Sequence, residues 1–222
     1  MRKYLAELIG TFIMVFCGTG AMVIDQQTGG AVTHVGVAIT WGLIVMVMIY
    51  ALGEVSGAHM NPAVSIAFAV ARRFKVTLLP GYIISQLAGA VLASLSLKLL
   101  FPSSPLLGAT LPAGSEMQSF VLELLLTFFL MLVIMQVAHG SKEQGMFAGI
   151  AIGAVVGLEA MFAGPICGAS MNPARSVGPA IISGHIEHLW LYIVAPMVGA
   201  ALAIPIWKYL CEPAVISTDI SA

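Results

Sequence analysis

The chain has 222 residues, of which 59% are hydrophobic and only 9% are charged, and its formal net charge is −1. A soluble domain of this size does not need so much apolar surface, whereas a set of lipid-facing helices does. The charge balance shows no basic excess, so we expect no nucleic-acid partner. Three widely separated cysteines form neither a metal-ligand pattern nor a disulfide framework, and we expect no metal and no cofactor.

Six long apolar segments follow one another along the chain. They cover about residues 4–24, 35–53, 80–101, 118–138, 146–163 and 188–210, and each is close to the roughly 20 residues that a membrane-spanning helix needs. The first segment could be read as a signal peptide, but its length and the embedded Glu7 favour a retained helix. The sequence therefore predicts an all-α membrane protein that spans the bilayer six times.

Two shorter apolar stretches begin at Asn61 and Asn172 and continue for about ten residues each, too few to cross a bilayer. Proline is the second residue of both stretches, and the first turn of a helix tolerates proline because its N–H has no intrahelical partner. We interpret the stretches as half-helices that enter the membrane from re-entrant loops. Irregular backbone survives at that depth only where it is buried in protein or lines a watery cavity.

The two halves of the chain resemble each other. The decapeptide at residues 56–65, Ser-Gly-Ala-His-Met-Asn-Pro-Ala-Val-Ser, returns at residues 167–176 as Cys-Gly-Ala-Ser-Met-Asn-Pro-Ala-Arg-Ser. We therefore predict one membrane domain over 1–222, made of a first repeat at 1–111 and a second at 112–222. Because each repeat has an odd number of spans, the second starts from the opposite side of the membrane, and the two motifs meet near its midplane.

The basic residues indicate the orientation in the membrane. In a six-span arrangement one side holds Arg2, Lys3, Arg72, Arg73, Lys75, Lys142 and Lys208. The opposite loops, at about 25–34, 102–117 and 183–187, contain no lysine or arginine. Since basic residues favour the cytoplasmic side, we expect both termini in the cytoplasm and the protein in a cell membrane, either a plasma membrane or a bacterial inner membrane.

The paired motif suggests how a polar molecule could pass. The half-helices would meet at their positively polarised N-termini, where Pro62-Ala63 and Pro173-Ala174 begin the helices and the Asn61 and Asn172 side chains offer NH₂ donors. Donors of this kind bind a water or hydroxyl oxygen, and two positive helix ends oppose cations, including hydronium. We expect the preceding extended stretches to supply lumen-facing carbonyl acceptors, from Gly57, Ala58, His59, Cys167 and Gly168. A single Asn-Pro could be an ordinary helix cap, but the duplication favours a pore.

The two motifs resemble those of the aquaporins, the major intrinsic protein family, and the resemblance covers nearly the whole chain. It implies the aquaporin fold, with six transmembrane helices and two re-entrant half-helices in an inverted repeat. It also implies a pore in every protomer and a homotetramer in the lipid bilayer. By the same resemblance, Glu7 and Glu123 hold the re-entrant loops through backbone N–H groups.

Members of that family narrow their pore at an outer constriction of four residues. Counting from the motifs, these positions correspond to Trp41, Ala160, Ala169 and Arg175. An arginine in so apolar a context is expected to face a polar cavity, where its five N–H groups suit oxygen ligands. A large indole opposite two methyl groups predicts a wide, half-apolar opening, similar to that of plant nodulin-like intrinsic proteins and their bacterial relatives.

The sequence thus predicts a passive channel for water and small uncharged solutes such as glycerol, urea and metalloid hydroxides, which excludes ions and protons. Ser176 and Ala180 resemble the residues of water-selective members, so a strict water channel is the first alternative. An ion-coupled secondary transporter is a more remote alternative, because inverted repeats and broken helices also occur there. The chain has none of the common hydrolase or metalloprotease motifs, and we do not expect an enzyme.

The roles of His59, Glu159 and a glycine repeat can also be predicted from the sequence. We expect His59 to brace its loop rather than to act as a pH gate. Glu159, inside the fifth segment, is expected to brace the loop before Asn172, with a pore-lining, pH-sensitive role as the alternative. Glycines at 145, 149, 153 and 157 form a four-residue repeat, which predicts close packing of that segment against another helix.

Overall fold

A computed structural model of the protein describes residues 1–138 and 141–211. The part of the chain that it describes is built from helices and contains no strand. Six helices are long and apolar enough to cross a membrane, in agreement with the six predicted segments. They are α1 (Arg2–Gln27), α2 (Thr33–Ser56), α4 (Leu79–Leu100), α5 (Glu116–Ala138), α7 (Ala148–Cys167) and α9 (Leu189–Cys211). A 3₁₀ turn at Val76–Leu78 precedes α4, and α6 (Lys142–Met146) is a single short turn.

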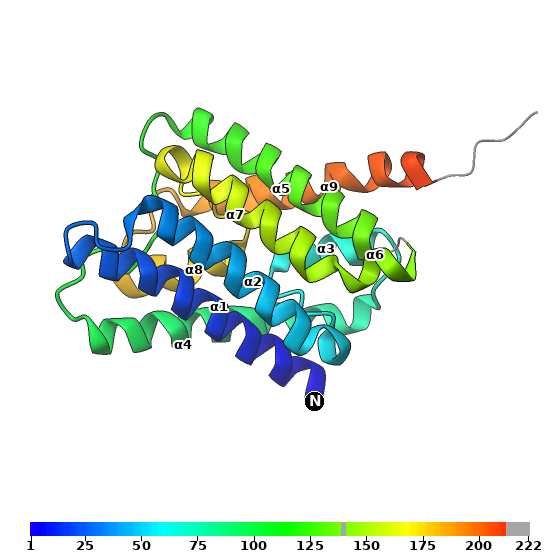
Figure 1. Ribbon diagram of the computed structural model, residues 1–222, viewed down its shortest axis with the longest axis horizontal. Helices are drawn as coiled ribbons and strands as arrows, with labels where there is room; N and C mark the ends of the chain where they lie inside the picture. Colours follow the sequence, from blue (N-terminus) through cyan, green and yellow to red (C-terminus); the bar gives the residue numbers. More distant parts are fainter. Residues whose placement is uncertain (139–140, 212–222) are drawn as a thin grey trace, which may run out of the picture.

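The two predicted half-helices are present as α3 (Pro62–Val70) and α8 (Pro173–Ser183), of nine and eleven residues. Both begin at a proline directly after an asparagine N-cap, as expected for a helix start. Figure 1 shows α3 toward the end of the molecule that carries the N-terminus and α8 toward the opposite end. The half-helices therefore enter the helix bundle from opposite ends.

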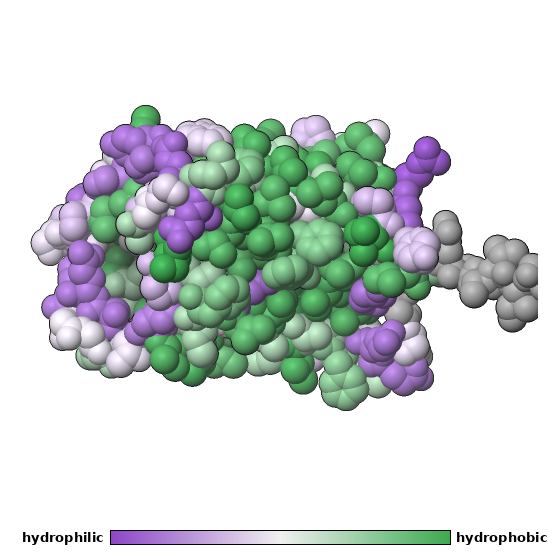
Figure 2. Space-filling model, turned by 90° about the horizontal axis from the view of Figure 1, so that it is seen from above, coloured by the Kyte–Doolittle hydropathy of each residue, from purple (hydrophilic) through white to green (hydrophobic). Residues whose placement is uncertain are grey.

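The outer surface of the bundle is apolar between two polar ends, as Figure 2 shows. Large hydrophobic side chains such as Leu43, Leu158 and Leu202 are 52%, 63% and 49% exposed. A continuous apolar surface of this extent is unfavourable in water and matches the hydrocarbon core of a bilayer. The fold is therefore that of a multi-pass membrane protein.

Basic residues gather at one end of the bundle. The start of α1, the loop after α3 and the end of α9 all lie at this end, where they carry Arg2, Lys3, Arg72, Arg73, Lys75 and Lys208 (Figure 1). The loops at 28–32, 101–115 and 184–188 lie at the other end. Lys98, near the second end, directs its Nζ to the carbonyl oxygen of Pro102 at 3.0 Å, which places its charge beyond the last turn of α4.

Glycines allow the helix pairs to approach closely. A Cβ built on Gly153 of α7 would lie 2.7 Å from the Cβ of Met46 in α2, and one on Gly42 would lie 2.7 Å from the carbonyl oxygen of Gly153. Gly149 and Gly157 also pack against α2, as the glycine spacing predicted. Gly145, however, belongs to α6 and has no neighbour that a Cβ would meet, so the packing stripe starts one turn later than expected.

Candidate pore and its constriction

The loops that lead into the two half-helices share an unusual backbone. Gly57 and Gly168 end α2 and α7 in the left-handed conformation, with φ of 89° and 84°. Two non-glycine residues in each loop also have positive φ: 46° at Ala58, 47° at Met60, 42° at Ala169 and 53° at Met171. Such angles are unfavourable for residues with a Cβ, so the surrounding contacts must hold both loops in place.

Glu7 of α1 contacts the first loop from the protein interior. Its carboxylate accepts hydrogen bonds from the backbone N–H of His59 at 2.9 Å and of Met60 at 2.7 Å. It also accepts from Ser56 Oγ at 2.7 Å and from Gln86 Nε2 at 2.7 Å. Four donors around one fully buried carboxylate fix two successive peptide units of the loop.

Glu123 of α5 contacts the second loop in the equivalent way. Its two oxygens accept from the backbone N–H of Ser170 at 2.7 Å and of Met171 at 2.8 Å. The helix ends before the loops are also matched, because Tyr82 donates to the Ser56 carbonyl at 2.7 Å and Tyr192 to the Cys167 carbonyl at 2.8 Å. The two halves thus hold their loops with corresponding residues, although Glu123 receives fewer donors than Glu7.

The two motif asparagines cap their own half-helices and bind the opposite loop. Asn61 Oδ1 accepts from the N–H of Ala63 at 2.9 Å, and Asn172 Oδ1 accepts from that of Ala174 at 3.0 Å. The amide nitrogens cross over: Asn61 donates to the Met171 carbonyl at 2.7 Å and Asn172 donates to the Met60 carbonyl at 2.8 Å.

An NH₂ group has two hydrogens, so each asparagine keeps one donor beyond the crossed bond. The crossed bonds thereby fix the direction of the remaining donors, one on Asn61 and one on Asn172. Both side chains line a cavity of about 160 Å³ inside the bundle.

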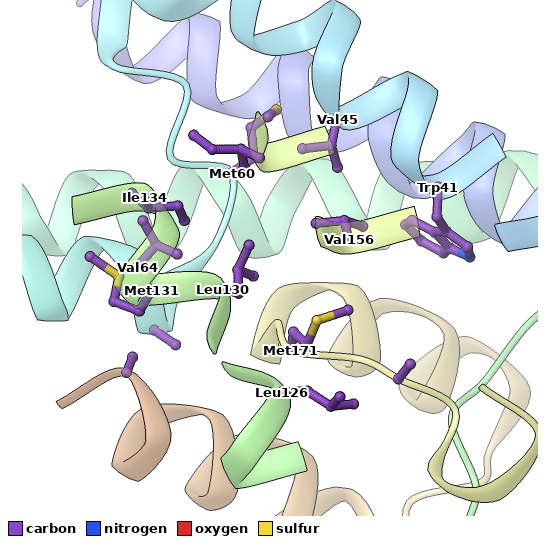
Figure 3. Close-up of a cluster of buried hydrophobic side chains, with 14 of the residues drawn as sticks. Trp41, Val45, Met60, Val64, Leu126, Leu130, Met131, Ile134, Val156 and Met171 are labelled. Carbon is purple, nitrogen blue, oxygen red and sulfur yellow. The ribbon is translucent and has the colours of Figure 1, made fainter. Parts of the chain in front are cut away.

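Most of the cavity wall is apolar. Its aliphatic side includes Val45, Leu130, Ile134 and Val156, contributed by α2, α5 and α7. Figure 3 shows Trp41 beside Val156, and Met60 and Met171 on the extended segments that lead into the half-helices. The polar groups belong mainly to the two loops, so the cavity has one hydrogen-bonding side and one apolar side. A small molecule with both hydroxyl groups and a carbon skeleton fits this division.

Arg175, three residues after Asn172, lines the same cavity and is 2% exposed. Its Nη1 donates to the carbonyl oxygen of Gly108 at 2.8 Å, and its guanidinium carbon lies 4.8 Å from the centre of the Trp41 ring. Its Nη2 contacts the sulfur of Met22 at 3.2 Å. The guanidinium is therefore fixed between the loop that follows α4, the indole of α2 and the thioether of α1.

Five other predicted site residues lie in or beside this region. Gly57, Ala58 and His59 line the cavity together with Trp41 and Arg175. Ala160 and Ala169 are 7% exposed and are not among the residues that line it. His59 Nδ1 lies 3.0 Å from Ser65 Oγ, and its ring stacks on Phe68, so it is packed as a loop brace.

Cys167 and Gly168 end α7 just before the second loop. Cys167 is 0% exposed, and its carbonyl oxygen accepts the hydroxyl of Tyr192. Gly168, next along the chain, is absent from the cavity wall and forms the left-handed cap of α7. A carbonyl oxygen has two lone pairs, so the bond from Tyr192 leaves the Cys167 carbonyl able to accept one more donor. The lumen-facing carbonyls of Cys167 and Gly168 therefore stay predictions.

Glu159 also differs from the expectation. It is 2% exposed, and within the described residues neither of its carboxylate oxygens has a hydrogen-bond partner. It therefore makes no bracing bond to the loop before Asn172, and it does not line the cavity either. Nothing in the structure explains why a carboxyl group is placed here.

Several contacts of the site had little signal in the sequence. Tyr82 and Tyr192 recur at matching positions of the two halves, which could have identified them as a structural pair. Gln86 follows Tyr82 by one helical turn and is polar within an apolar span, which is a weaker signal. The contacts of Met22 and Gly108 with Arg175 could not be found in this way, because neither residue belongs to a motif.

These features define a class of protein: a membrane channel whose pore lies inside one helical bundle, between two half-helices. The profile of the Major intrinsic protein family matches residues 1–207. The chain belongs to that family, whose members are passive channels rather than enzymes, and it forms a channel for water and small neutral solutes.

Known relatives agree with this assignment. The chain is 49% identical over 210 residues to aquaporin NIP1-1 of Zea mays, covering 94% of this chain and 74% of the relative. It is 46% identical over 201 residues to nodulin-26 of Glycine max, covering 90% of this chain and 74% of the relative. The crystal structure of the aquaglyceroporin from Plasmodium falciparum superposes with a TM-score of 0.83 at 29% identity, covering 95% of this chain and 96% of that one.

Proposed function

We propose that the cavity is the solute path and that Trp41, Ala160, Ala169 and Arg175 form its outer constriction. The observation that carries this proposal is the pair of crossed asparagine bonds, which places two fixed donors at one point of a mostly apolar cavity. A constriction at Arg175 is supported by its position on the wall of the same cavity, three residues beyond Asn172.

Proton and cation exclusion follow from the same geometry. The remaining N–H groups of Asn61 and Asn172 both donate, so a water bound between them is held by its oxygen and directs its hydrogens away from the midplane. Proton transfer along a water file needs each water to accept as well as donate, and this arrangement interrupts it. The positive N-termini of α3 and α8 and the charge of Arg175 oppose cations in addition.

The proposed solutes beyond water are glycerol, urea and metalloid hydroxides. At the proposed constriction the methyl side chains of Ala160 and Ala169 would leave space for a carbon chain. The aliphatic wall of Val45, Leu130 and Val156 can contact that chain without loss of hydrogen bonds. The similar proteins are named as aquaporins and an aquaglyceroporin, which fits this range. Ser176, which resembles the water-selective type, is buried at 0% exposure and bonded to Thr110 at 2.8 Å, away from the cavity wall.

The assembly and location are proposals as well. The matched contacts of Glu7 and Glu123, and of the two motif asparagines, support an inverted repeat of 1–111 and 112–222, although residues 212–222 lie outside the described part of the chain. The basic end of the bundle favours cytoplasmic termini in a plasma or bacterial inner membrane. The family resemblance favours a homotetramer with one pore in each protomer.

The test is to fill the constriction with one side chain. In proteoliposomes, Ala160→His is expected to keep water permeability and to lose most glycerol permeability, because the imidazole occupies the space of the carbon chain. Ala160→Ser is the matched control and is expected to pass both molecules. Unchanged glycerol permeability in Ala160→His would show that position 160 lies outside the constriction.

A further inference from the structure

The guanidinium of Arg175 contacts a methionine that is not one of the four proposed constriction residues. Met22, half-buried on α1, places its sulfur 3.2 Å from Nη2 of Arg175. The other fixed contacts are the Gly108 carbonyl and the Trp41 ring. Of the five N–H groups of the guanidinium, these contacts use two, so three are left beyond them.

A thioether is the weakest of these partners. Neutral sulfur accepts hydrogen bonds poorly, so Met22 restrains Arg175 with little competition against the oxygen of a solute. The sulfur is, however, the one atom among these contacts that mild oxidants convert into a different functional group.

We propose that Met22 is a redox-sensitive modification site that sets the solute range of the constriction. The inference rests on the proposed function, in which Arg175 donates to passing solutes. Hydrogen peroxide is the oxidant: a lone pair of the Met22 sulfur attacks one peroxide oxygen, the O–O bond breaks, and the departing oxygen leaves as water after proton transfer. The sulfur is oxidised by two electrons to the sulfoxide, and the peroxide is reduced.

The sulfoxide changes the contact with Arg175 in two ways. Its oxygen is a strong acceptor, and a bond from the charged guanidinium to it is shorter and stronger than the bond to the thioether. It also adds one oxygen atom at the constriction, and the stronger bond holds the Nη2 donor against the oxygen of a passing solute, which can displace the weaker thioether. We expect glycerol permeability to fall more than water permeability, because glycerol needs both the wider opening and the N–H donors of Arg175.

The experiment compares the ratio of glycerol to water permeability in proteoliposomes before and after treatment with hydrogen peroxide. In the wild type the ratio is expected to fall about fivefold, the factor that one typical hydrogen bond is worth. Met22→Leu keeps the volume but has no oxidisable sulfur, and its ratio is expected not to change. Met117→Leu is the matched control, because Met117 is 69% exposed at the start of α5 and makes no contact with Arg175; it is expected to respond like the wild type.

A second variant reproduces the modified state without an oxidant. Met22→Gln places an amide oxygen near Nη2, and its ratio is expected to be low without treatment and unaffected by peroxide. Methionine sulfoxide reductases, one for each sulfoxide epimer, are expected to restore the wild-type ratio. Peptide mass spectrometry reports whether Met22 carries the added oxygen.

Two results would overturn the proposal: an equal fall in the ratio of Met22→Leu, or an unchanged ratio in wild-type protein whose Met22 is fully oxidised. Failure of Met22 to oxidise while Met117 does would also reject it. If the untreated wild type passes water but not glycerol, the proposed solute range fails instead. The peroxide response of the same variants is then measured in water permeability, with the same expected order.

Discussion

Gly18 of α1 packs directly against the indole ring of Trp41. A Cβ built on Gly18 would lie 2.5 Å from Cδ2 of Trp41, whereas carbon atoms in ordinary contact are about 3.5–4.0 Å apart. In Gly18→Ala the indole must therefore move by about 1 Å or more. Because Trp41 lines the cavity, the displaced ring takes space from the lumen.

A displacement of this size is large for a pore that passes one molecule at a time. A water molecule has a radius of about 1.4 Å, so water tolerates a narrowing that excludes a carbon chain. We expect Gly18→Ala to lower glycerol permeability at least tenfold and water permeability by a much smaller factor. The assay is stopped-flow light scattering on proteoliposomes with matched protein content.

Two variants make this prediction specific. Gly20→Ala, two residues along the same helix, meets Leu97 at an ordinary 3.5 Å and is expected to behave like the wild type. Gly18→Ala combined with Trp41→Phe removes the second ring of the indole, including Cζ2, which is one of the overlapping atoms, and is expected to recover part of the glycerol permeability. If Gly18→Ala alone leaves the glycerol-to-water ratio unchanged, Trp41 does not limit the width of the pore.

Three further predictions concern the loops. In Glu7→Gln and Glu123→Gln an amide nitrogen, which cannot accept, replaces one carboxylate oxygen, so two of the four bonds are lost at Glu7 and one of the two at Glu123. Each lost bond to a charged group is worth about 2 kcal/mol, so the variants should destabilise the protein by about 4 and about 2 kcal/mol. Thermal unfolding in detergent measures both, and equal losses would refute the comparison. Burial, and secondarily the charge of Lys3, lowers the pKa of His59 to about 4, so His59 stays neutral and water permeability should be constant between pH 8 and 5. The unfolded chain binds this proton near pH 6.5, so the free energy of unfolding should fall by about 2 kcal/mol in total from pH 6 to pH 4 in the wild type and by less in His59→Gln.

The sequence was most informative where the chain repeats itself. The six spans follow from length and hydropathy, and the starts of α3 and α8 follow from Asn61-Pro62 and Asn172-Pro173, whose cap chemistry is local. One Asn-Pro pair alone is weak evidence for a pore, but two pairs at matching positions of the two halves are strong evidence. Counting from the motifs also identified Trp41 and Arg175, which the structure places beside each other on the cavity wall.

Other features depend on contacts between distant segments and could not be predicted. Which atoms accept from Arg175 is decided by the packing of α1 and of the loop after α4, and neither Met22 nor Gly108 carries a local pattern. An extended stretch before the half-helix predicts a lumen-facing carbonyl at Cys167, and the hydrogen bond that this carbonyl accepts from Tyr192 of α9 depends on a contact between distant segments. The sequence predicts that Glu159 braces a loop, whereas in the fold its carboxylate has no hydrogen-bond partner among the described residues.

The measurement that tests the channel most directly is stopped-flow light scattering on proteoliposomes of the wild type, challenged first with sucrose and then with glycerol. We expect rapid shrinkage in sucrose and rapid re-swelling in glycerol, both linear in the gradient and independent of any proton or sodium gradient. Rapid shrinkage without accelerated re-swelling would show that the protein conducts water but not glycerol. Rates equal to those of empty liposomes, or rates that saturate and follow an ion gradient, would contradict the assignment of the cavity as an open pore.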